Sequence, residues 1–453
     1  MTIIKPSAGR SAPTLGPRAS GAALVAAILV GSAMFGCGTG RAAGRPAVKP
    51  GQTVVSLEFD DGFATQWEAR RLLADRHLRA TFFIVSGAVG TPGYLDWRQV
   101  GALQSDGNEI AGHTVTHPHL AALAVDEARR EICLGRQALL DRGFPVTDMA
   151  YPYGSYNRKT EQIAAECGYN SARTIDGPDP SACPTCAHAE RIPPVDAYAT
   201  RGVFLATDTT DAAALEAAVT DAESHGGGWV HVVVHRLCDG CDRVSTTPAV
   251  LAAFLEWLAP RQRSGTVVRT VREVVGGPVR PPVAAPAATP PIGASNALPN
   301  ASLEQDADGD GVPDCWSETG YGEGTATWTR TADSHGGGSA LRLDVSSLRS
   351  GDRKLVLSQD LGTCSPSAAP GASYRVTAWY RASAQPILVA FSRDASGHWQ
   401  YWSESPPLAP SSAWTQANWT TPPAPGGTAG LSVGVLLKTP GSLTVDDLSL
   451  TAA

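Results

Sequence analysis

Two adjacent carboxylates, Asp60 and Asp61, come at the end of an apolar run that begins at Val54. The run predicts a buried strand, and the Asp-Asp-Gly sequence that ends it predicts that both acids lie where the strand opens into a loop. Neighbouring carboxylates repel each other, so they persist best where a cation or a shared proton gives them different roles. The pair is therefore the first candidate for a metal centre or an acid–base centre.

His113 and His117, which follow a second strand-like run at residues 108–112, supply nitrogen ligands. Histidines four positions apart reach the same side of a helical turn, and with Asp61 they form a set of two nitrogens and one oxygen. Such a set leaves one coordination position open for water and accepts zinc, cobalt, nickel or manganese. We expect one divalent transition metal here, with zinc as the first choice.

These stretches resemble the motifs of a known family. Residues 56–62 (Ser-Leu-Glu-Phe-Asp-Asp-Gly) and 113–117 (His-Thr-Val-Thr-His) are similar to the first two motifs of the polysaccharide deacetylases, the NodB-homology enzymes of carbohydrate esterase family four. Residues 150–154 (Ala-Tyr-Pro-Tyr-Gly) resemble the third motif, and 232–235 (Val-Val-Val-His) resemble the fifth. The resemblance extends over about residues 52–277 and implies a distorted (β/α)7 barrel, with each motif at the C-terminal end of a strand.

The resemblance also implies how these residues would hydrolyse an acetyl group. A divalent metal lowers the pKa of a water molecule toward about 7 and polarises the carbonyl. Asp60, next to the metal ligand Asp61, would take the proton from that water. The backbone N–H of Tyr153 would help to hold the oxyanion, and His235 would protonate the leaving group.

One position departs from the family pattern. The arginine that orients the catalytic Asp in the third motif is replaced by Ala150, and Arg191 is our candidate for its role. Each assignment also has a structural alternative. In that alternative the two acids form a capped turn, His113 and His117 are an ordinary buried pair, and His235 is a structural histidine after an apolar strand.

The N-terminus has the pattern of a secretory leader. Arg10 and Arg18 precede an apolar stretch at residues 22–30 that is short for a transmembrane helix. We therefore expect residues 1–49 to be a leader and flexible segment, and the protein to be exported. Cys37 is either a lipid-anchored cysteine that holds the protein at the outer face of the membrane or a bystander removed with the leader.

Export makes disulfides the expected state of the other eight cysteines. They form two Cys-x-x-Cys motifs and two distant pairs, namely Cys183 with Cys186, Cys238 with Cys241, Cys133 with Cys167, and Cys315 with Cys364. The spacing of the two Cys-x-x-Cys motifs also fits a four-cysteine zinc site. Outside the cell we favour disulfides, either between the two motifs or within each.

Composition divides the rest of the chain. Segments typical of strands and helices alternate over residues 50–277, which predicts a parallel α/β catalytic domain. Seven of the 22 residues at 278–299 are proline and almost none is charged, so we expect an extended linker rather than a loop within one domain. Residues 300–453 contain short alternating strands with turn residues between them, which predicts a jelly-roll-like β-sandwich.

The predicted sandwich resembles the carbohydrate-binding modules of secreted polysaccharide enzymes, by pattern rather than by a sharp motif. Its aromatic residues either stack on sugar rings or belong to the core, and they include Trp399, Tyr401, Trp402, Trp414 and Trp419. Four carboxylates near its start suit calcium, and they are Asp306, Asp308, Asp310 and Asp314. No acid stands at the twelfth position of an EF-hand loop, so the alternatives are a structural calcium site and a solvated acidic turn.

The net charge of -7 gives no basic surface for nucleic acid. The leading hypothesis is an exported metal-dependent hydrolase that removes N-acetyl groups from an amino-sugar polymer such as chitin, peptidoglycan or poly-N-acetylglucosamine. Removal of O-acetyl groups from acetylated xylan is the nearest alternative, and a non-catalytic glycan-binding surface protein is the alternative from another class. A polysaccharide is the expected partner in each case, and the sequence does not predict an oligomeric state.

Overall fold

The computed structural model describes residues 49–453 with the exception of 176, 178–186 and 202–203. Residues 1–48 of the predicted leader, including Cys37, therefore lie outside the described residues, as do Cys183 and Cys186. Within the described part of the chain, no helix has both the length and the apolar character needed to cross a membrane.

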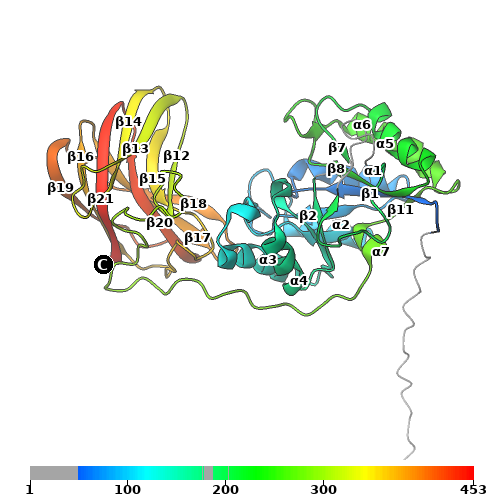
Figure 1. Cartoon of the computed structure of the whole chain (residues 1–453), viewed down its shortest axis with the longest axis horizontal. Helices are drawn as coiled ribbons and strands as arrows, with labels where there is room; N and C mark the ends of the chain where they lie inside the picture. The colour runs from blue at the N-terminus through cyan, green and yellow to red at the C-terminus, as the bar shows by residue number, and fades with distance from the viewer. Residues whose placement is uncertain (1–48, 176, 178–186, 202–203) are drawn as a thin grey trace, which may run out of the picture. The chain divides into compact units, whose positions relative to one another are not determined.

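A parallel sheet fills the first part of the described chain (Figure 1). Its strands are β1 (Thr53–Phe59), β2 (Thr81–Ile84), β3 (Glu109–Gly112), β4 (Asp148–Ala150), β5 (Ser171–Thr174), β6 (Thr200–Arg201), β7 (Phe204–Leu205), β8 (Gly228–Val234) and β11 (Val267–Val268). The order is β6-β5-β4-β3-β2-β1-β8-β7, with β11 attached to β1. Among the described residues β6 and β7 end the path without pairing to each other. The predicted distorted (β/α)7 barrel is confirmed.

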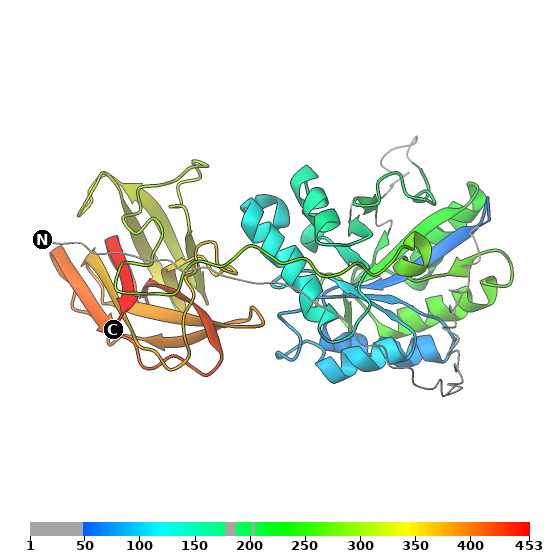
Figure 2. The same ribbon diagram turned by 90° about the horizontal axis from the view of Figure 1, so that it is seen from below.

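Helices connect these strands and flank the sheet (Figure 2). They are α1 (Ala69–Ala74), α2 (Trp97–Ser105), α3 (Val125–Leu140), α4 (Arg158–Glu166), α5 (Ala212–Ser224), α6 (Pro248–Arg261) and α7 (Val271–Val275), with short 3-10 turns η1 (Ala64–Glu68), η2 (Leu120–Ala122) and η3 (Pro152–Gly154). A small strand pair, β9 (Arg236–Leu237) and β10 (Ser245–Thr246), follows β8. Capping boxes at Asp96 and Asn157 start α2 and α4, because each side chain accepts a hydrogen bond from the first turn.

Strand β1 shows how the barrel separates apolar from polar residues. Val55, Leu57 and Phe59 belong to the core that the sheet shares with the helices. Because successive side chains point to opposite faces of a strand, Glu58 and Asp60 face the inside of the barrel. Both are buried, with 0% and 2% of their surface exposed. The inside of the barrel therefore holds charged groups that must find partners there.

An all-β domain of two five-stranded antiparallel sheets forms the last part of the chain (Figure 1). Its strands are β12 (Trp316–Tyr321), β13 (Gly324–Thr331), β14 (Ala340–Leu348), β15 (Asp352–Leu357), β16 (Tyr374–Ala382), β17 (Pro386–Asp394), β18 (Trp399–Glu404), β19 (Ser411–Thr420), β20 (Thr428–Leu437) and β21 (Gly441–Ala452). The sheet orders are β12-β15-β20-β17-β18 and β13-β14-β21-β16-β19. The predicted all-β sandwich is confirmed.

The core of the sandwich lies between its two sheets and takes alternate residues from each, such as Leu355 from β15 and Val376 from β16. Trp316 belongs to this core, and Trp402 and Trp419 pack partly against it. These three tryptophans therefore belong at least partly to the core of the sandwich. The exposed aromatic side chains of this domain are instead tyrosines, with Tyr401 56% exposed.

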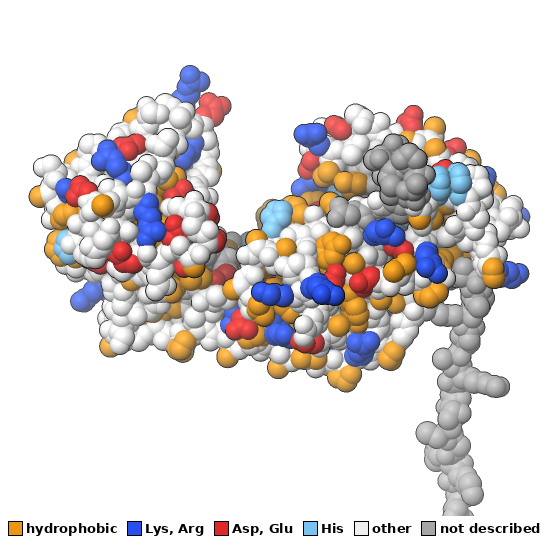
Figure 3. Space-filling model, viewed as in Figure 1, with side chains coloured by type: hydrophobic (Ala, Val, Ile, Leu, Met, Phe, Trp, Pro, Cys, Tyr) orange, Lys and Arg blue, Asp and Glu red, His pale blue; other side chains and the backbone are white. Residues whose placement is uncertain are grey.

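The segment between the two cores has no helix or strand from the end of α7 to the start of β12. Its backbone is nevertheless held in places, because the buried Arg136 of α3 donates a hydrogen bond to the carbonyl of Arg280 at 2.8 Å. Acidic and basic side chains are mixed over the face of the molecule drawn in Figure 3, and no continuous basic area is visible there. The predicted boundaries at 277 and 300 stay a prediction.

Three disulfides are present among the described residues. Cys133–Cys167 and Cys315–Cys364 are the two distant pairs predicted from the sequence. Cys238–Cys241 is bonded within its own motif, so it neither joins the other motif nor forms part of a four-cysteine zinc site. The state of the other motif lies outside the described residues.

We expect the Cys133–Cys167 bond to stabilise the barrel through loop closure. Its partners are 34 positions apart, whereas those of Cys238–Cys241 are 3 apart. A loop of the longer size corresponds to roughly 2–4 kcal/mol of stability in the chain-entropy account. Replacing both Cys133 and Cys167 with Ala should lower the free energy of unfolding by that amount in urea titrations. The matched double replacement of Cys238 and Cys241 should cost much less, and equal losses would contradict the explanation.

Candidate metal centre and active site

Parallel strands bring the predicted functional residues to one end of the barrel. Asp60 and Asp61 follow β1, His113 follows β3, and His235 follows β8. The carboxyl ends of parallel strands meet at the same edge of a sheet, so side chains just beyond these ends are brought together. The N–H of Asp60 donates a hydrogen bond to the carbonyl of Val234 at 3.0 Å, which fixes the ends of β1 and β8 side by side.

Asp61, His113 and His117 meet at one point. Oδ1 of Asp61 lies 3.3 Å from Nε2 of His113 and 3.0 Å from Nε2 of His117. The two Nε2 atoms are 3.2 Å apart. Ligand atoms at about 2.0–2.1 Å from a tetrahedral zinc ion are separated by roughly 3.3 Å, so the three atoms have the spacing of a metal-binding set.

The hydrogen bonding of these residues fits a cation between them. Nδ1 of His113 donates to the carbonyl of Ala150 at 2.8 Å, which leaves the lone pair of its Nε2 directed at Asp61. Oδ1 of Asp61 is a buried oxygen without a hydrogen-bond partner among the described residues. Lone pairs that face one another in a buried site repel unless a cation or a trapped proton lies between them. A divalent metal would satisfy all three atoms at once.

Four residues around this point adopt left-handed backbone conformations. The φ angle is 77° at Asp61, 67° at Thr114, 65° at His117 and 57° at Tyr153. Each such conformation costs a non-glycine residue on the order of 1–3 kcal/mol and persists only where the surrounding structure holds it. The loops after β1, β3 and β4 therefore have strained shapes that the rest of the barrel maintains.

Glu131 of α3 holds the loop that carries both histidines. Its Oε2 accepts hydrogen bonds from the N–H groups of Val115 and Thr116, each at 2.9 Å, and its Oε1 accepts one from Oγ1 of Thr116 at 2.5 Å. Gly135 of the same helix lies against this loop, because a Cβ there would come within 2.8 Å of the carbonyl carbon of Thr114. Burial raises the pKa of Glu131 to about 7, although its three donors oppose that rise.

We expect Glu131→Gln to remove a pH dependence of stability. A folded-state pKa of about 7, above the ordinary 4.5, means that the protonated carboxyl stabilises the fold. This contribution is complete below the ordinary pKa and is lost as the pH rises through the folded one. Relative to Glu131→Gln, the native protein should lose about 3 kcal/mol of unfolding free energy over that interval. Urea unfolding of both proteins at several pH values measures it, and a constant difference would contradict the assignment.

Asp60 belongs to a buried chain of charged side chains. Nη2 of Arg173, on β5, lies 2.6 Å from Oδ1 and 2.5 Å from Oδ2 of Asp60. Nε of Arg173 lies 2.7 Å from Oε2 of Glu58, and Oε1 of Glu58 lies 2.6 Å from Nδ1 of His231. Burial by itself raises the pKa of Asp60, but the charges of Arg173, His113 and His235 together outweigh it, and the pKa lies below its ordinary value. Asp60 is therefore ionised at neutral pH.

The prediction that Arg191 orients Asp60 is wrong, and Arg173 has that position. Arg191 follows Glu190, whose backbone pairs with Trp229 near the start of β8. Asp60 contacts the other end of the same strand, at Val234. Five residues of extended strand span roughly 16 Å, so the two ends are too far apart for a side chain of this segment to bridge them.

Arg173 compensates for the small side chain at position 150. Ala150 on β4 and Arg173 on β5 are register partners in the sheet. A guanidinium on the neighbouring strand thus fills the space that an arginine at position 150 would occupy. The sequence did contain a signal, because strand alternation places Ser171 and Arg173 on the face opposite the core residue Ala172. A buried strand with a charged residue on its inner face requires a buried partner.

His235 lies next to the proposed base. Its Nε2 is 3.9 Å from Oδ2 of Asp60, and its side chain is 17% exposed. The side-chain amide of Gln66 donates to the backbone carbonyls of Asp60 and His235, at 2.5 and 2.7 Å. One glutamine therefore fixes the two strand ends on which the proposed base and acid stand.

Tyr153 borders the metal-binding residues with an exposed side chain. It is 55% exposed, and its ring centroid lies 4.5 Å from that of His117 in an edge-to-face arrangement. The ring of His119 stacks on the ring of Tyr153, and their centroids are 4.0 Å apart. His119 thus packs on Tyr153 and is not part of the group of converging ligand atoms. The role of the Tyr153 N–H stays a prediction.

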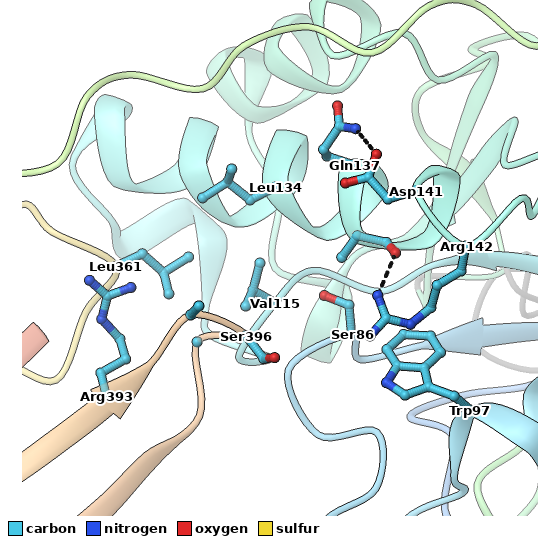
Figure 4. Close-up of a pocket in the computed structure, with 13 residues that line it drawn as sticks. Ser86, Trp97, Val115, Leu134, Gln137, Asp141, Arg142, Leu361, Arg393 and Ser396 are labelled. Atoms are coloured by element: carbon cyan, nitrogen blue, oxygen red, sulfur yellow. Dashed lines mark hydrogen bonds between the residues drawn. The ribbon is translucent and has the colours of Figure 1, made fainter. Parts of the chain in front are cut away.

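Val85, Tyr94, Thr116 and His117 line the barrel's surface beside the metal-binding residues. The side chain of His117 is 22% exposed, so a ligand can reach this side of the metal-binding residues. A pocket of about 260 Å³ is shown in Figure 4 and is lined in part by Trp97 and Arg142. None of Asp61, His113 and His117 lines this pocket, so it is not part of the candidate active site.

The predicted calcium ligands are only partly brought together. Asp306, Asp308 and Asp310 offer oxygens within 4.8 Å of one another. Asp314 is not in that group, and its Oδ1 accepts a hydrogen bond from the N–H of Ala307 at 3.1 Å. Asp306 also accepts hydrogen bonds from two backbone N–H groups of its own loop. The choice between a structural calcium site and a solvated acidic turn stays a prediction.

The fold and the site together define a class of protein. It is a parallel α/β barrel with two histidines and one carboxylate converging at the carboxyl ends of its strands, beside an ionised buried carboxylate. In metal-dependent hydrolases such ligand sets leave a position for water.

Comparison with known proteins agrees with this class. The family model for polysaccharide deacetylase matches residues 47–172. The putative polysaccharide deacetylase YxkH of Bacillus subtilis (strain 168) is 28% identical over 131 residues, which cover 28% of this chain and 47% of that protein. The peptidoglycan-N-acetylglucosamine deacetylase PgdA of Listeria monocytogenes is 30% identical over 118 residues, covering 25% of this chain and 24% of that protein. These matches support a polysaccharide deacetylase domain in the barrel.

Among solved structures, the family 4 carbohydrate esterase from Streptomyces lividans in complex with acetate is 21% identical, with a TM-score of 0.34. The match covers 51% of this chain and 100% of that one. The chain spans less than half the length of the first curated relatives it matches, at 47%, 5% and 47%.

Proposed function

We propose that this protein is a metal-dependent deacetylase that removes N-acetyl groups from an amino-sugar polymer. The observation that carries the proposal is the convergence of Asp61, His113 and His117 within 3.3 Å of one another. An ionised Asp60 beside them supplies a general base, which amide hydrolysis needs and a purely structural metal site does not. PgdA, which matches part of the barrel, is named for deacetylation of peptidoglycan N-acetylglucosamine.

Each residue would have a separate task in amide hydrolysis. The metal, when bound, supplies a Lewis acid that activates water and polarises the acetyl carbonyl. Asp60 accepts the proton of the attacking water, since Arg173 keeps its carboxylate ionised. His235 donates a proton to the departing sugar nitrogen, and the backbone N–H of Tyr153 donates a hydrogen bond to the oxyanion. Acetate and a free amine are the products.

The proposal also includes the metal, the location of the protein and the role of the sandwich, as expected from the sequence. The metal would be zinc, and the protein would be exported, either free or anchored through a lipid on Cys37. The sandwich would keep the barrel close to its polymer, as a carbohydrate-binding module does. Calcium would bind at the predicted set of Asp306, Asp308, Asp310 and Asp314, of which the first three offer oxygens within 4.8 Å of one another.

Acetate release from three acetylated polymers tests the proposal and its alternatives. Chitin oligomers and peptidoglycan carry N-acetyl groups, whereas acetylated xylan carries O-acetyl groups. We expect acetate from an N-acetylated polymer, loss of activity after chelation, and recovery on addition of Zn²⁺. His113→Ala, which removes a ligand, is the inactive control. Acetate from xylan alone would favour the esterase, and binding without acetate release would favour a non-catalytic protein.

A further inference from the structure

A second group of two histidines and one carboxylate lies outside the candidate active site. It consists of His188, Asp221 and His225, whose potential ligand atoms all lie within 4.8 Å of one another. The donor set is the same as that of Asp61, His113 and His117.

Helix α5 supplies two of the three residues. Asp221 lies in its last turn, and His225, four positions later, is its C-terminal capping residue. Side chains four positions apart lie on the same face of a helix. The C-terminal end of a helix also carries partial negative charge, which favours a cation at this place.

The third residue comes from a segment that is held to the barrel independently. His188 stands two positions before Glu190, whose backbone exchanges hydrogen bonds with Trp229 of β8, at 2.9 and 2.7 Å. This pairing fixes where the segment runs, so the approach of His188 to α5 does not depend on the histidine itself.

The two histidine side chains already converge on the carboxylate of Asp221. Nδ1 of His188 lies 2.6 Å from Oδ2 of Asp221, and Nδ1 of His225 lies 3.2 Å from Oδ1. The two imidazole rings are stacked face to face, with centroids 3.4 Å apart and planes 2° from parallel. Both nitrogens thus lie beside the same carboxylate, one at each oxygen. Nδ1 of His225 also lies 2.8 Å from the backbone carbonyl oxygen of Asp221. Neutral imidazole is the form that binds metals, and the nitrogen that binds the metal must carry no hydrogen.

We propose that His188, Asp221 and His225 bind a second divalent transition metal, separate from the catalytic one. Two imidazoles and a carboxylate suit zinc and nickel rather than calcium or magnesium. The side chains are 26%, 41% and 47% exposed, so water completes the coordination sphere. The metal ties the segment before β8 to α5, at the end of β8 opposite His235. The site is therefore structural and takes no part in the proposed reaction.

Zinc binding by the full-length protein tests this site. Protein stripped with chelator is titrated with Zn²⁺ by calorimetry, with excess Ca²⁺ present to occupy the acidic loop at Asp306. We expect the native protein to bind one equivalent more than the double variant His188→Ala/His225→Ala. His335→Ala is the matched control. Nδ1 of His335 also lies 2.6 Å from a carboxylate oxygen, that of Asp447. Among the described residues, however, His335 belongs to no group of three potential metal ligands.

A second measurement separates this site from the proposed catalytic one. The variant His113→Ala/His117→Ala should still bind one equivalent of Zn²⁺, and its melting temperature should rise when zinc is added. That rise should disappear when His188 and His225 are also replaced. The same stoichiometry in the native protein and in His188→Ala/His225→Ala would overturn the inference. Acetate release by His188→Ala/His225→Ala should stay at the native level. Acetate release tests the proposed function, whereas zinc stoichiometry tests the second metal site.

Discussion

Replacing Asp60 with Asn is expected to lower kcat for acetate release by about 10²- to 10⁴-fold while leaving the bound metal in place. Asn has the shape of Asp but cannot accept the proton of an attacking water. Arg173 would still find an oxygen acceptor at position 60, so the variant should fold. The metal ligands Asp61, His113 and His117 are unchanged, and their affinity for the metal should be close to native.

Two measurements on the same preparation check this expectation: steady-state acetate release and metal content per chain. Asp75→Asn is the matched control, because it makes the same chemical change at a side chain that is 54% exposed and pairs with Arg71 at the surface. The control should keep native kcat and native metal content. Native-like turnover by Asp60→Asn with metal bound would show that the base is another group. Loss of metal together with activity would show that Asp60 acts mainly in holding the ligands.

Replacing Arg173 with Met is expected to cost stability and activity together. Arg173 is the buried cation between Asp60 and Glu58, and removing it leaves only His235 beside Asp60 and His231 beside Glu58. Breaking a buried ion pair by removing one partner typically costs about 3–5 kcal/mol. Without Arg173 burial would raise the pKa of Asp60, so the acid limb of the pH profile of kcat/KM should move to higher pH.

A control and a rescue make this prediction specific. Arg136→Met also removes a buried arginine, but Arg136 donates only to backbone carbonyls, including those of Cys167 and Val146. That variant should lose stability without a shift in the pH profile. The double variant Ala150→Arg/Arg173→Ala moves the guanidinium to the register partner, and should regain part of the activity lost by Arg173→Ala. Failure of the rescue with a folded barrel would mean that Asp60 is not oriented by a guanidinium alone.

The pH dependence of stability should also reveal the ion pair between Arg173 and Asp60. The pKa of Asp60 in the folded protein lies below the ordinary value of 3.8, so the ion pair stabilises the fold above that pH. The stabilisation is lost as the pH falls through the lower, folded-state pKa. In Arg173→Met this acid-labile contribution should be absent, which urea unfolding at several acidic pH values measures.

Local sequence was enough to predict the metal-binding set and the broad fold. The three metal-binding residues lie directly after or near short apolar strands, at Asp61, His113 and His117. Alternating strands and helices predict a parallel sheet, in which the carboxyl ends of the strands share one edge. The convergence of these residues therefore follows from topology alone. The pairing of Cys133 with Cys167 was expected because these cysteines remain after the two Cys-x-x-Cys motifs, and the disulfide between them confirms it.

The identity of the residue beside Asp60 needed the tertiary structure. Arg191 and Arg173 are both arginines downstream of the third motif, and local sequence does not say which end of a strand each one reaches. Only the register of β4 with β5 places Arg173 in the space next to Ala150. Strand register depends on the packing of whole sheets, because a shift of one residue turns every side chain to the other face.

The sequence by itself determined the chemistry of the site, since ligand type and spacing are written in motifs a few residues long. The tertiary structure decided which buried charges pair with one another, as with Arg173 and Glu58, and which histidines from distant segments meet, as with His188 and His225. The physical reason is range. Strand and turn preferences act between neighbours in the chain, whereas burial and charge pairing act between groups that only the folded chain brings into contact.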